Sequence, residues 1–197
     1  NYIELSKNSF EKDLKFTDAI SLIERLQKFA KEHGKIFGIK LSNTLGVENF
    51  KQKLPGKEMY LSGRALFPLT INLAYKIAKE FDGNILISYS GGASILNTQK
   101  ILTTGIYPIT FATDLLKPGG YYRLYQIVRD FENHFNEIDF YNGKIDLTAL
   151  KDLADDSLKN KLYFKETREV DSIKLSKELP LFDCYIAPCQ VTCPIEQ

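Results

Sequence analysis

The chain has 197 residues, of which 44% are hydrophobic and 26% are charged, and its formal net charge is +1. This is the composition of a globular protein with a real core, and the length is that of one domain or at most two. The balanced charge argues against a nucleic-acid-binding protein with a basic surface, and the lack of an apolar run of about 18 residues argues against a membrane span.

The first predicted element is a helix over residues 17–33, because apolar residues recur there at spacings of three and four. Thr17 is its expected N-cap and Gly34 its expected stop. A short strand is predicted next, over residues 36–41. The following stretch, residues 42–67, holds several glycines and a proline, and we expect a long structureless loop there, of the kind that usually serves function.

Helices and strands then alternate. The pattern predicts helices over residues 68–81, 97–103 and 121–135, with strands over 84–89 and 108–112. Short strands that are apolar throughout indicate an α/β fold whose parallel sheet is covered by helices. A complete (β/α)8 TIM-like barrel needs about 250 residues, so the chain would supply somewhat under half of one.

The pattern changes after residue 136. Residues 137–180 are rich in mixed charge, and we expect a linker with one weak helix near 147–158 and an extended stretch near 161–165. Because residue 1 is Asn rather than Met and a motif ends close to Gln197, we expect the chain to be an internal piece of a longer protein.

All three cysteines, Cys184, Cys189 and Cys193, lie within ten residues of one another, and Pro194 follows the last. Clustered thiolates followed by a proline are typical of iron–sulfur loops and suit a reducing compartment, which predicts a cytoplasmic protein. A 4Fe–4S cluster needs four ligands, so the fourth is expected outside this chain. A partial zinc site, or three unrelated cysteines, is the alternative.

Two turns after predicted strands carry residues suited to an anion. Ser90-Gly91-Gly92 follows one strand, and Ala112-Thr113 ends the next. Loops after the last two strands of a barrel commonly bind phosphate through backbone N–H groups, and glycine lets the backbone approach an anion closely. A plain strand-to-helix turn is the alternative interpretation.

The strand over residues 36–41 also ends in polar residues. Lys40, Asn43 and Thr44 lie at what would be the catalytic rim of a barrel, where they could bind a flavin or a substrate. The alternative interpretation is that the lysine is simply solvated and the asparagine only forms a turn. Farther on, Arg64 could reach an anion and Ser62 could be a weak proton donor, although this stretch is more often a structural entry to a helix.

Three runs of the chain resemble one family: residues 61–68 (LSGRALFP), 88–92 (SYSGG) and 109–121 (ITFATDLLKPGGY). That family is the iron–sulfur subunit of a "putative selenate reductase", in which a barrel similar to dihydroorotate dehydrogenase precedes a cysteine-rich helical domain similar to that of the glutamate synthase small subunit. The resemblance covers about residues 9–135 and 181–197.

The resemblance implies a domain layout and a set of site residues. Residues 1–136 would be the C-terminal part of the barrel, 137–180 the linker, and 181–197 the start of the 4Fe–4S domain. The cysteines match three ligands of the first cluster of the family. Leu181 stands at the position where the dihydropyrimidine dehydrogenase version has a further cysteine. The residues that match the FMN-binding stretches are Asn43, Thr44, Ser90, Gly91, Gly92, Ala112 and Thr113.

The function expected from this resemblance is electron transfer between NAD(P)H, flavin, iron–sulfur clusters and an unknown acceptor. The parent protein would be the oxidoreductase, with FAD and NADPH on its other domains, while this piece alone would be inactive; no catalytic residue is assigned. Expected partners are the remaining domains or subunits of a redox complex, or a second copy through the open barrel edge. The alternative is a non-catalytic barrel that serves as an assembly or docking module.

Overall fold

The computed structural model describes residues 10–11, 13–49, 55–134 and 144–163, and these belong to one compact unit. Its helices are α1 (Phe16–Glu32), α2 (Phe67–Glu80), α3 (Thr98–Thr103), α4 (Gly120–His134) and α5 (Leu147–Ser157), with short 3-10 turns η1 (Gly63–Leu66) and η3 (Lys161–Tyr163). Its strands are β1 (Gly38–Leu41), β2 (Leu45–Glu48), β3 (Glu58–Leu61), β4 (Leu86–Ser90) and β5 (Ile109–Thr110).

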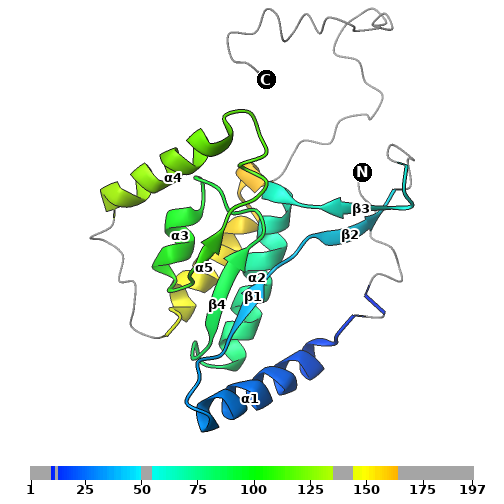
Figure 1. Ribbon diagram of the computed structural model, residues 1–197, viewed down its shortest axis with the longest axis vertical. Coiled ribbons are helices and arrows are strands. Elements are labelled where there is room, and N and C mark those ends of the chain that lie inside the picture. The colour runs from blue at the N-terminus through cyan, green and yellow to red at the C-terminus, as the bar shows by residue number, and fades with distance from the viewer. Residues whose placement is uncertain (1–9, 12, 50–54, 135–143, 164–197) are drawn as a thin grey trace, which may run out of the picture. The chain divides into compact units, whose positions relative to one another are not determined.

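Three of the strands form a parallel sheet in the order β1-β4-β5 (Figure 1). Leu41 pairs with Tyr89, and Tyr89 pairs with Ile109, so the carboxyl ends of all three strands meet at one edge. The prediction of an α/β fold with a parallel sheet is confirmed. Because β4 lies in the centre, the loops that follow β4 and β5 are neighbours.

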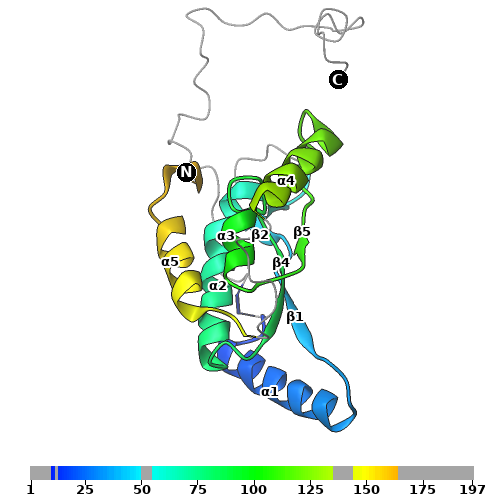
Figure 2. The ribbon, with the colours of Figure 1, turned by 90° about the vertical axis from the view of Figure 1, so that its left-hand side faces the viewer.

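One face of the sheet is covered by two layers of helices. Ile87 and Tyr89 on β4 pack into a core with Phe67, Ile71 and other apolar residues of α2. Figure 2 shows this sheet, then α2 and α3, and then α5 on the outside. The opposite face carries no such cover among the described residues.

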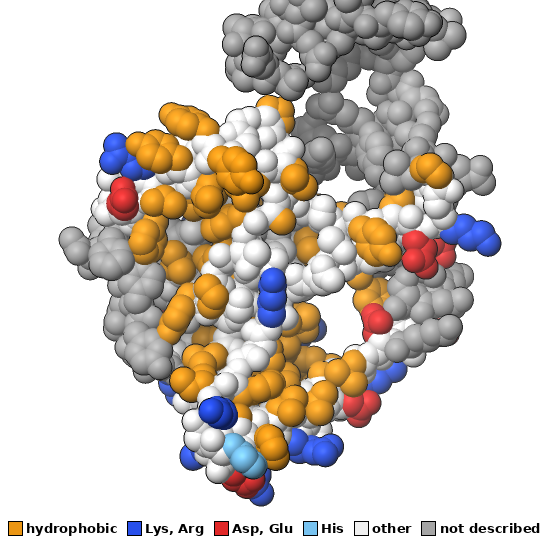
Figure 3. Space-filling view, viewed as in Figure 1, with side chains coloured by type: hydrophobic (Ala, Val, Ile, Leu, Met, Phe, Trp, Pro, Cys, Tyr) orange, Lys and Arg blue, Asp and Glu red, His pale blue; other side chains and the backbone are white. Residues whose placement is uncertain are grey.

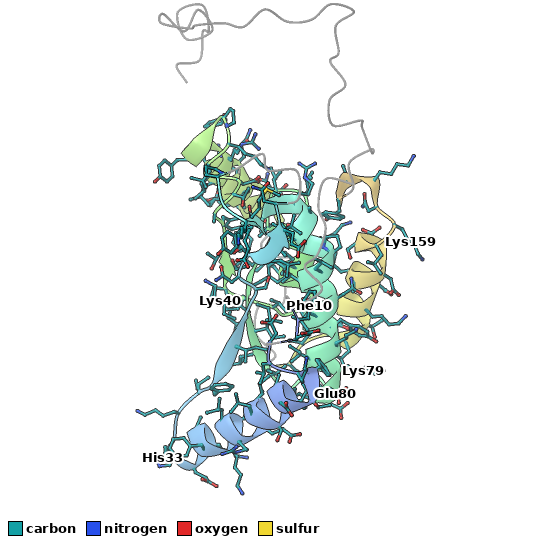
Figure 4. All side chains as sticks on the ribbon, turned by 90° about the vertical axis from the view of Figure 1, so that its right-hand side faces the viewer. Phe10, His33, Lys40, Lys79, Glu80 and Lys159 are labelled. Atoms are coloured by element: carbon teal, nitrogen blue, oxygen red, sulfur yellow. The ribbon has the colours of Figure 1, made fainter. Side chains whose placement is uncertain are left out.

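Apart from Leu86, the strand side chains on that uncovered face are polar or absent. Gly38, Lys40 and Thr110 are exposed there, while Ile39 and Leu41 on the same strand pack toward the core. In Figure 4, Lys40 extends from the sheet on the side away from α2, and Lys159 lies beyond α5 on the other side. In a barrel, the uncovered face would be the interior.

Helix α5 occupies part of the stretch that the sequence analysis assigned to a linker. Leu150 and Ala154 on this helix are fully buried against the core. The Asn72 amide on α2 donates hydrogen bonds to the Ala154 carbonyl and the Ser157 hydroxyl, both at 3.2 Å. Residues 144–163 are therefore part of the folded unit, because their apolar stripe finds a partner on α2; the proposed boundaries at 136 and 180 stay predictions.

The structure corrects four local predictions. Residues 42–67 are not structureless, since β2 and β3 pair there as an antiparallel hairpin. Helix α1 begins at Phe16, after Lys15, and no side chain caps it. The strand predicted over 108–112 is only two residues long. The stretch expected to be extended near 161–165 begins instead with the 3-10 turn η3.

Most of the apolar side of α1 lacks a partner among the described residues. Ile23 is buried, but Leu22, Leu26 and Phe29 are 42%, 38% and 60% exposed. Apolar side chains also gather on α4, at the upper left of Figure 3, and Tyr121 is 82% exposed there. A helix that buries only part of its apolar stripe indicates a surface that other segments cover.

Candidate functional site

A pocket of about 110 Å³ lies at the carboxyl ends of the three parallel strands. Its walls come from the ends of β1, β4 and β5, from the start of η1 and from the loops between them. The lining residues are Ser42, Asn43, Thr44, Ser62, Gly63, Leu66, Ser90, Gly91, Gly92, Ala93, Thr110, Ala112 and Thr113. All seven residues that the sequence analysis assigned to cofactor binding are therefore brought together in this one pocket; their role stays a prediction.

The two glycines after β4 fit where other residues would not. Gly91 and Gly92 have φ angles of 122° and 74°, which side chains rarely tolerate. A Cβ atom on Gly92 would lie 2.6 Å from the Gly63 carbonyl oxygen and 2.9 Å from the Phe67 nitrogen. The loop therefore sits against the first residues of η1 and α2, and any larger residue would push it out of place.

Hydrogen bonds from the protein interior hold the carbonyl groups of these glycines. The Tyr89 hydroxyl donates to the Gly91 carbonyl at 3.1 Å, and the Asn97 amide donates to the Gly92 carbonyl at 3.0 Å. In a trans peptide the N–H points opposite to the carbonyl. The N–H groups of Gly92 and Ala93 therefore point away from these buried side chains, and they donate no hydrogen bond within the part of the chain that the structure describes.

The turn after β5 repeats this arrangement. The Leu115 N–H donates to the Ala112 carbonyl at 3.0 Å, and the Leu116 N–H donates to the Thr113 carbonyl at 3.3 Å. In these two peptides the N–H groups, which point opposite to the carbonyls, belong to Thr113 and Asp114. Two neighbouring strand ends thus each offer backbone N–H groups, which is the geometry of a backbone anion site.

Hydroxyl groups form the side of the pocket next to β1. The Ser42 hydroxyl lies 2.7 Å from the Thr70 hydroxyl, and the Ser42 N–H donates to the Ser90 carbonyl. These contacts fasten the end of β1 to that of β4 and to α2. Ser42 itself lines the pocket, so it adds a hydroxyl that could donate to a ligand.

Asn43 and Thr44 form the outer rim. The Thr44 N–H donates to the Asn43 side-chain oxygen at 2.9 Å, and both residues are exposed. Ser62 lines the pocket as well, whereas the Arg64 side chain donates to the Leu162 carbonyl at 3.3 Å and is not part of the lining. The anion-reaching role considered for Arg64 therefore has no support from its position.

No charged side chain is among the residues that line the pocket in the described part of the chain. The nearest carboxylate in sequence is that of Asp114, which is 7% exposed and lies 2.8 Å from the Lys117 ammonium group. The ammonium group beside it weakens the repulsion that this carboxylate would exert on an anion in the pocket. The lining offers N–H and O–H donors, and this donor set suits a phosphate group.

Two tyrosines beneath the pocket stay uncharged at neutral pH. Burial raises the pKa of Tyr89 well above its usual range, the nearby Tyr163 raises it further, and a hydrogen bond with Thr70 lowers it in part. Burial also raises the pKa of Tyr163, which a hydrogen bond with Asn97 partly offsets. The neutral Tyr89 phenol donates a hydrogen bond to the Gly91 carbonyl of the loop above it.

The predicted cluster ligands Cys184, Cys189 and Cys193 lie outside the described residues. Over residues 10–11, 13–49, 55–134 and 144–163, no three histidine, cysteine or carboxylate side chains come close enough to hold a metal ion. None of the helices described there has the length and apolar character that a membrane crossing requires.

The sequence analysis assigned no role to Ser42, which lines the pocket, or to Thr70, Tyr89 and Asn97, which support it from below. Tyr89 lies in a predicted strand, and the alternation of Ile87 and Tyr89 with Ser88 and Ser90 could have indicated that its side chain points to the covered face of the sheet. The others meet the loop through tertiary packing and leave no local signal.

Comparison with known proteins gives one family. The sequence profile described as "Oxidoreductase YgfK, N-terminal TIM-barrel domain" matches residues 1–165, the N-terminal part of this chain. Two curated proteins named "Putative oxidoreductase YgfK", from Escherichia coli strains K12 and O157:H7, are each 49% identical over all 197 residues. The chain covers 19% of their length. No solved structure matches the chain.

Proposed function

Because the chain belongs to the family of the N-terminal TIM-barrel domain of oxidoreductase YgfK, we propose that it supplies the phosphate-binding end of a flavin site in a redox enzyme. The bound group would be FMN, and its phosphate would sit in the pocket at the carboxyl ends of β1, β4 and β5. When bound, FMN would supply the electron-accepting and electron-donating chemistry. The residues of this chain would bind and orient it.

The observation that carries this proposal is the pair of backbone N–H runs at neighbouring strand ends. Gly92 and Ala93 follow β4, while Thr113 and Asp114 follow β5. The carbonyl groups of the same four peptides accept hydrogen bonds from other parts of the protein. Phosphate sites in barrels are commonly built by the loops after the last two strands. We therefore propose that β4 and β5 close the barrel, so that this chain forms its C-terminal portion.

The size of the pocket fits the phosphate and not the whole cofactor. Sites for drug-sized ligands occupy roughly 300–1,000 Å³, whereas this pocket measures about 110 Å³. The rest of a flavin would therefore extend beyond the lining described here. Among the described residues, Asn43 and Thr44 on the rim and Lys40 on the uncovered face of β1 are side chains that could meet it.

We further propose that the cysteines belong to the redox pathway of the parent protein. Cys184, Cys189 and Cys193 would hold a 4Fe–4S cluster with a fourth ligand outside this chain, in a reducing, cytoplasmic setting. Electrons would pass between NAD(P)H, FAD, the clusters, FMN and an acceptor. Because the chain spans only 19% of its curated relatives, the remaining length can hold the FAD and NADPH domains.

The test is the flavin and iron content of the full-length protein, purified without oxygen. We expect FMN and acid-labile sulfide in the wild type. In Gly92→Ala, the added Cβ would meet the Gly63 carbonyl and Phe67, so FMN content should fall at least tenfold while iron stays. Gly46→Ala is the matched control, because nothing lies within 4 Å of its added Cβ.

Each result has a clear meaning. Wild-type protein without FMN would refute the flavin site, and protein without iron and sulfide would refute the cluster. A Gly92→Ala protein that keeps its FMN would show that the flavin binds elsewhere. The second candidate function, a non-catalytic docking module, is favoured by the exposed apolar side chains on α4 and would be supported by protein with clusters and no FMN.

A further inference from the structure

Asn97 is the residue directly before α3, at the position where a side chain usually caps the helix. Asparagine is among the residues preferred there, yet its side chain makes no cap in this helix. The side chain is 1% exposed, and a buried amide group normally has hydrogen-bond partners. Its printed partners lie in the loop after β4, so the residue serves that loop rather than its own helix.

The two hydrogen bonds of this amide group span the loop. Its nitrogen donates to the Gly92 carbonyl at 3.0 Å, and its oxygen accepts from the Ser94 N–H at 2.9 Å. Because the nitrogen can only donate and the oxygen can only accept, turning the amide over would lose both bonds. The side chain therefore has one orientation, and it bridges the two ends of the segment 92–94.

These bonds decide which N–H groups of the loop remain for a ligand. The Gly92 carbonyl and the Ala93 N–H belong to one peptide group and point in opposite directions. Since Asn97 holds the carbonyl, the Ala93 N–H points away from that buried amide, and Ala93 lines the pocket. The Ser94 N–H is used by Asn97 itself. The ligand-facing donors of this segment are therefore the N–H groups of Gly92 and Ala93.

The backbone of the loop does not choose this orientation by itself. Glycine tolerates φ angles of both signs, so torsional preference alone leaves two orientations open to the peptide that follows Gly92. The reversed peptide would aim its carbonyl oxygen at the pocket, where it would repel a phosphate. A donor fixed behind the carbonyl disfavours the reversed state, and Asn97 is that donor.

We propose that Asn97 is a positioning residue for the phosphate pocket: by holding the Gly92 carbonyl it presents the Ala93 N–H to the phosphate of the ligand. This inference rests on the proposed function and deepens it. Asn97 is not among the residues that line the pocket, so it acts through the backbone alone. Tyr89 holds the Gly91 carbonyl separately, so a change at Asn97 leaves the preceding peptide in place.

The change that tests this is Asn97→Leu, which replaces the amide with an apolar group of similar shape. The variant can neither donate to Gly92 nor accept from Ser94, so the hydrogen bond from Ala93 to the phosphate should be lost. We expect the affinity of the full-length apoprotein for FMN to fall roughly tenfold to a hundredfold, the usual effect of one hydrogen bond to a charged group. Riboflavin, which has the flavin ring of FMN and no phosphate, should bind with unchanged affinity.

Asn72→Leu is the matched control, because it makes the same chemical change away from the pocket. The Asn72 amide donates to the Pro68 carbonyl at 2.8 Å and to the Ala154 carbonyl and the Ser157 hydroxyl at 3.2 Å. Both variants should have a lower free energy of unfolding, since each leaves buried polar groups without a partner. Only Asn97→Leu should change the ratio of the FMN and riboflavin dissociation constants. Fluorescence quenching measures those constants, and urea unfolding measures stability.

A second variant, Asn97→Ser, covers the case in which Asn97→Leu loses its structure. Serine is also preferred before a helix, and it carries no charge that could itself repel a phosphate. Its side chain is shorter than that of asparagine by one bond, so its hydroxyl would fall short of the Gly92 carbonyl. We expect the same selective loss of FMN affinity in this variant.

The outcomes distinguish the two proposals. Wild-type protein that binds neither flavin, or binds riboflavin as tightly as FMN, has no such phosphate site, and the proposed function fails. A preference for FMN that persists unchanged in both Asn97 variants overturns the role of Asn97 and leaves the proposed function standing. Equal weakening of both flavins in Asn97→Ser, or an equal change of the ratio in Asn72→Leu, also overturns it, because each is the result of a general loss of structure.

Discussion

Tyr89 illustrates how one buried side chain connects the core to the pocket. Its side chain is fully buried, its ring meets Phe67 edge to face at 6.1 Å, and its hydroxyl donates to the Gly91 carbonyl. Burial raises the pKa of this hydroxyl, so the folded protein holds the proton more tightly than the unfolded chain does. The consequence is a stability that depends on alkaline pH.

We expect the contribution of Tyr89 to the free energy of unfolding to be independent of pH below about pH 10. Above that pH this contribution should fall. Above the ordinary tyrosine pKa of about 10, the unfolded chain loses the proton while the folded state keeps it, so each pH unit favours unfolding by about 1.4 kcal/mol. Urea unfolding of the full-length protein at pH 8 to 11 measures this slope.

Tyr89→Phe provides the comparison. This variant should be less stable at pH 8, because the Gly91 carbonyl loses its donor, and its stability should fall less steeply above pH 10. Tyr163, whose pKa burial also raises, accounts for part of the slope that remains. Equal slopes in wild type and variant would show that Tyr89 ionises normally in the folded protein.

At the residue scale, sequence predicted the ligand-facing half of the site and missed the supporting half. Ser90-Gly91-Gly92 carries a local signal, because glycines after an apolar strand predict a turn that can approach an anion. Asn97 carries none, since only the folded loop brings its amide to the Gly92 carbonyl. An asparagine before a short helix is equally typical of a simple N-cap.

At the scale of elements, α5 shows how a polar segment can still belong to a core. Most of its exposed positions are charged, and this composition suggested a linker, but Leu150, Leu153 and Ala154 form a narrow apolar stripe. Asp146 caps the helix by accepting from the Thr148 N–H at 2.8 Å. The helix packs on α2, which in turn carries Thr70 beneath the pocket.

Leu150→Ala should therefore destabilise the domain by about 2–5 kcal/mol, the usual range for a fully buried leucine in a core. Leu158→Ala is the matched control at the end of the same helix, where the side chain is 54% exposed and the expected change is within about 0.5 kcal/mol. Urea unfolding of the two full-length variants makes the measurement. Equal effects would mean that α5 does not pack on α2 in solution.

The β2–β3 hairpin was the element that sequence did not reveal. Each strand has four residues, and the stretch between them contains Pro55 and Gly56, which made a functional loop the simpler interpretation. In hindsight Leu45, Val47, Met59 and Leu61 alternate with more polar residues, but runs of four are too short to decide between a strand and a loop.

At the scale of the whole molecule, the described parallel sheet has two open edges. Over the described residues, β1 and β5 each pair on one side only, and one face of the sheet has no helix over it. Lys40 on β1 and the two-residue length of β5 give the edges some protection against pairing with other chains. The exposed apolar surface of α1 has no comparable protection.

We expect the 197-residue chain, produced alone, to associate with itself. Leu22, Leu26 and Phe29 form one exposed side of α1. Exposed apolar surface of this kind tends to associate with other apolar surface, because burial removes it from water. Light scattering should show species larger than the 22.5 kDa monomer. Replacing Phe29 with Lys should reduce this association, because the new charge would have to be buried at the contact.

Phe29→Lys leaves the core intact, since Phe29 is 60% exposed and contacts His33 on its own helix. In the full-length protein, the rest of the barrel would cover the same side of α1, and the substitution should lower stability rather than change the oligomeric state. The two results together would indicate that another segment of the full-length protein covers this side of α1. A monodisperse 197-residue monomer would contradict this arrangement, because the surface would then be stable in water without any cover.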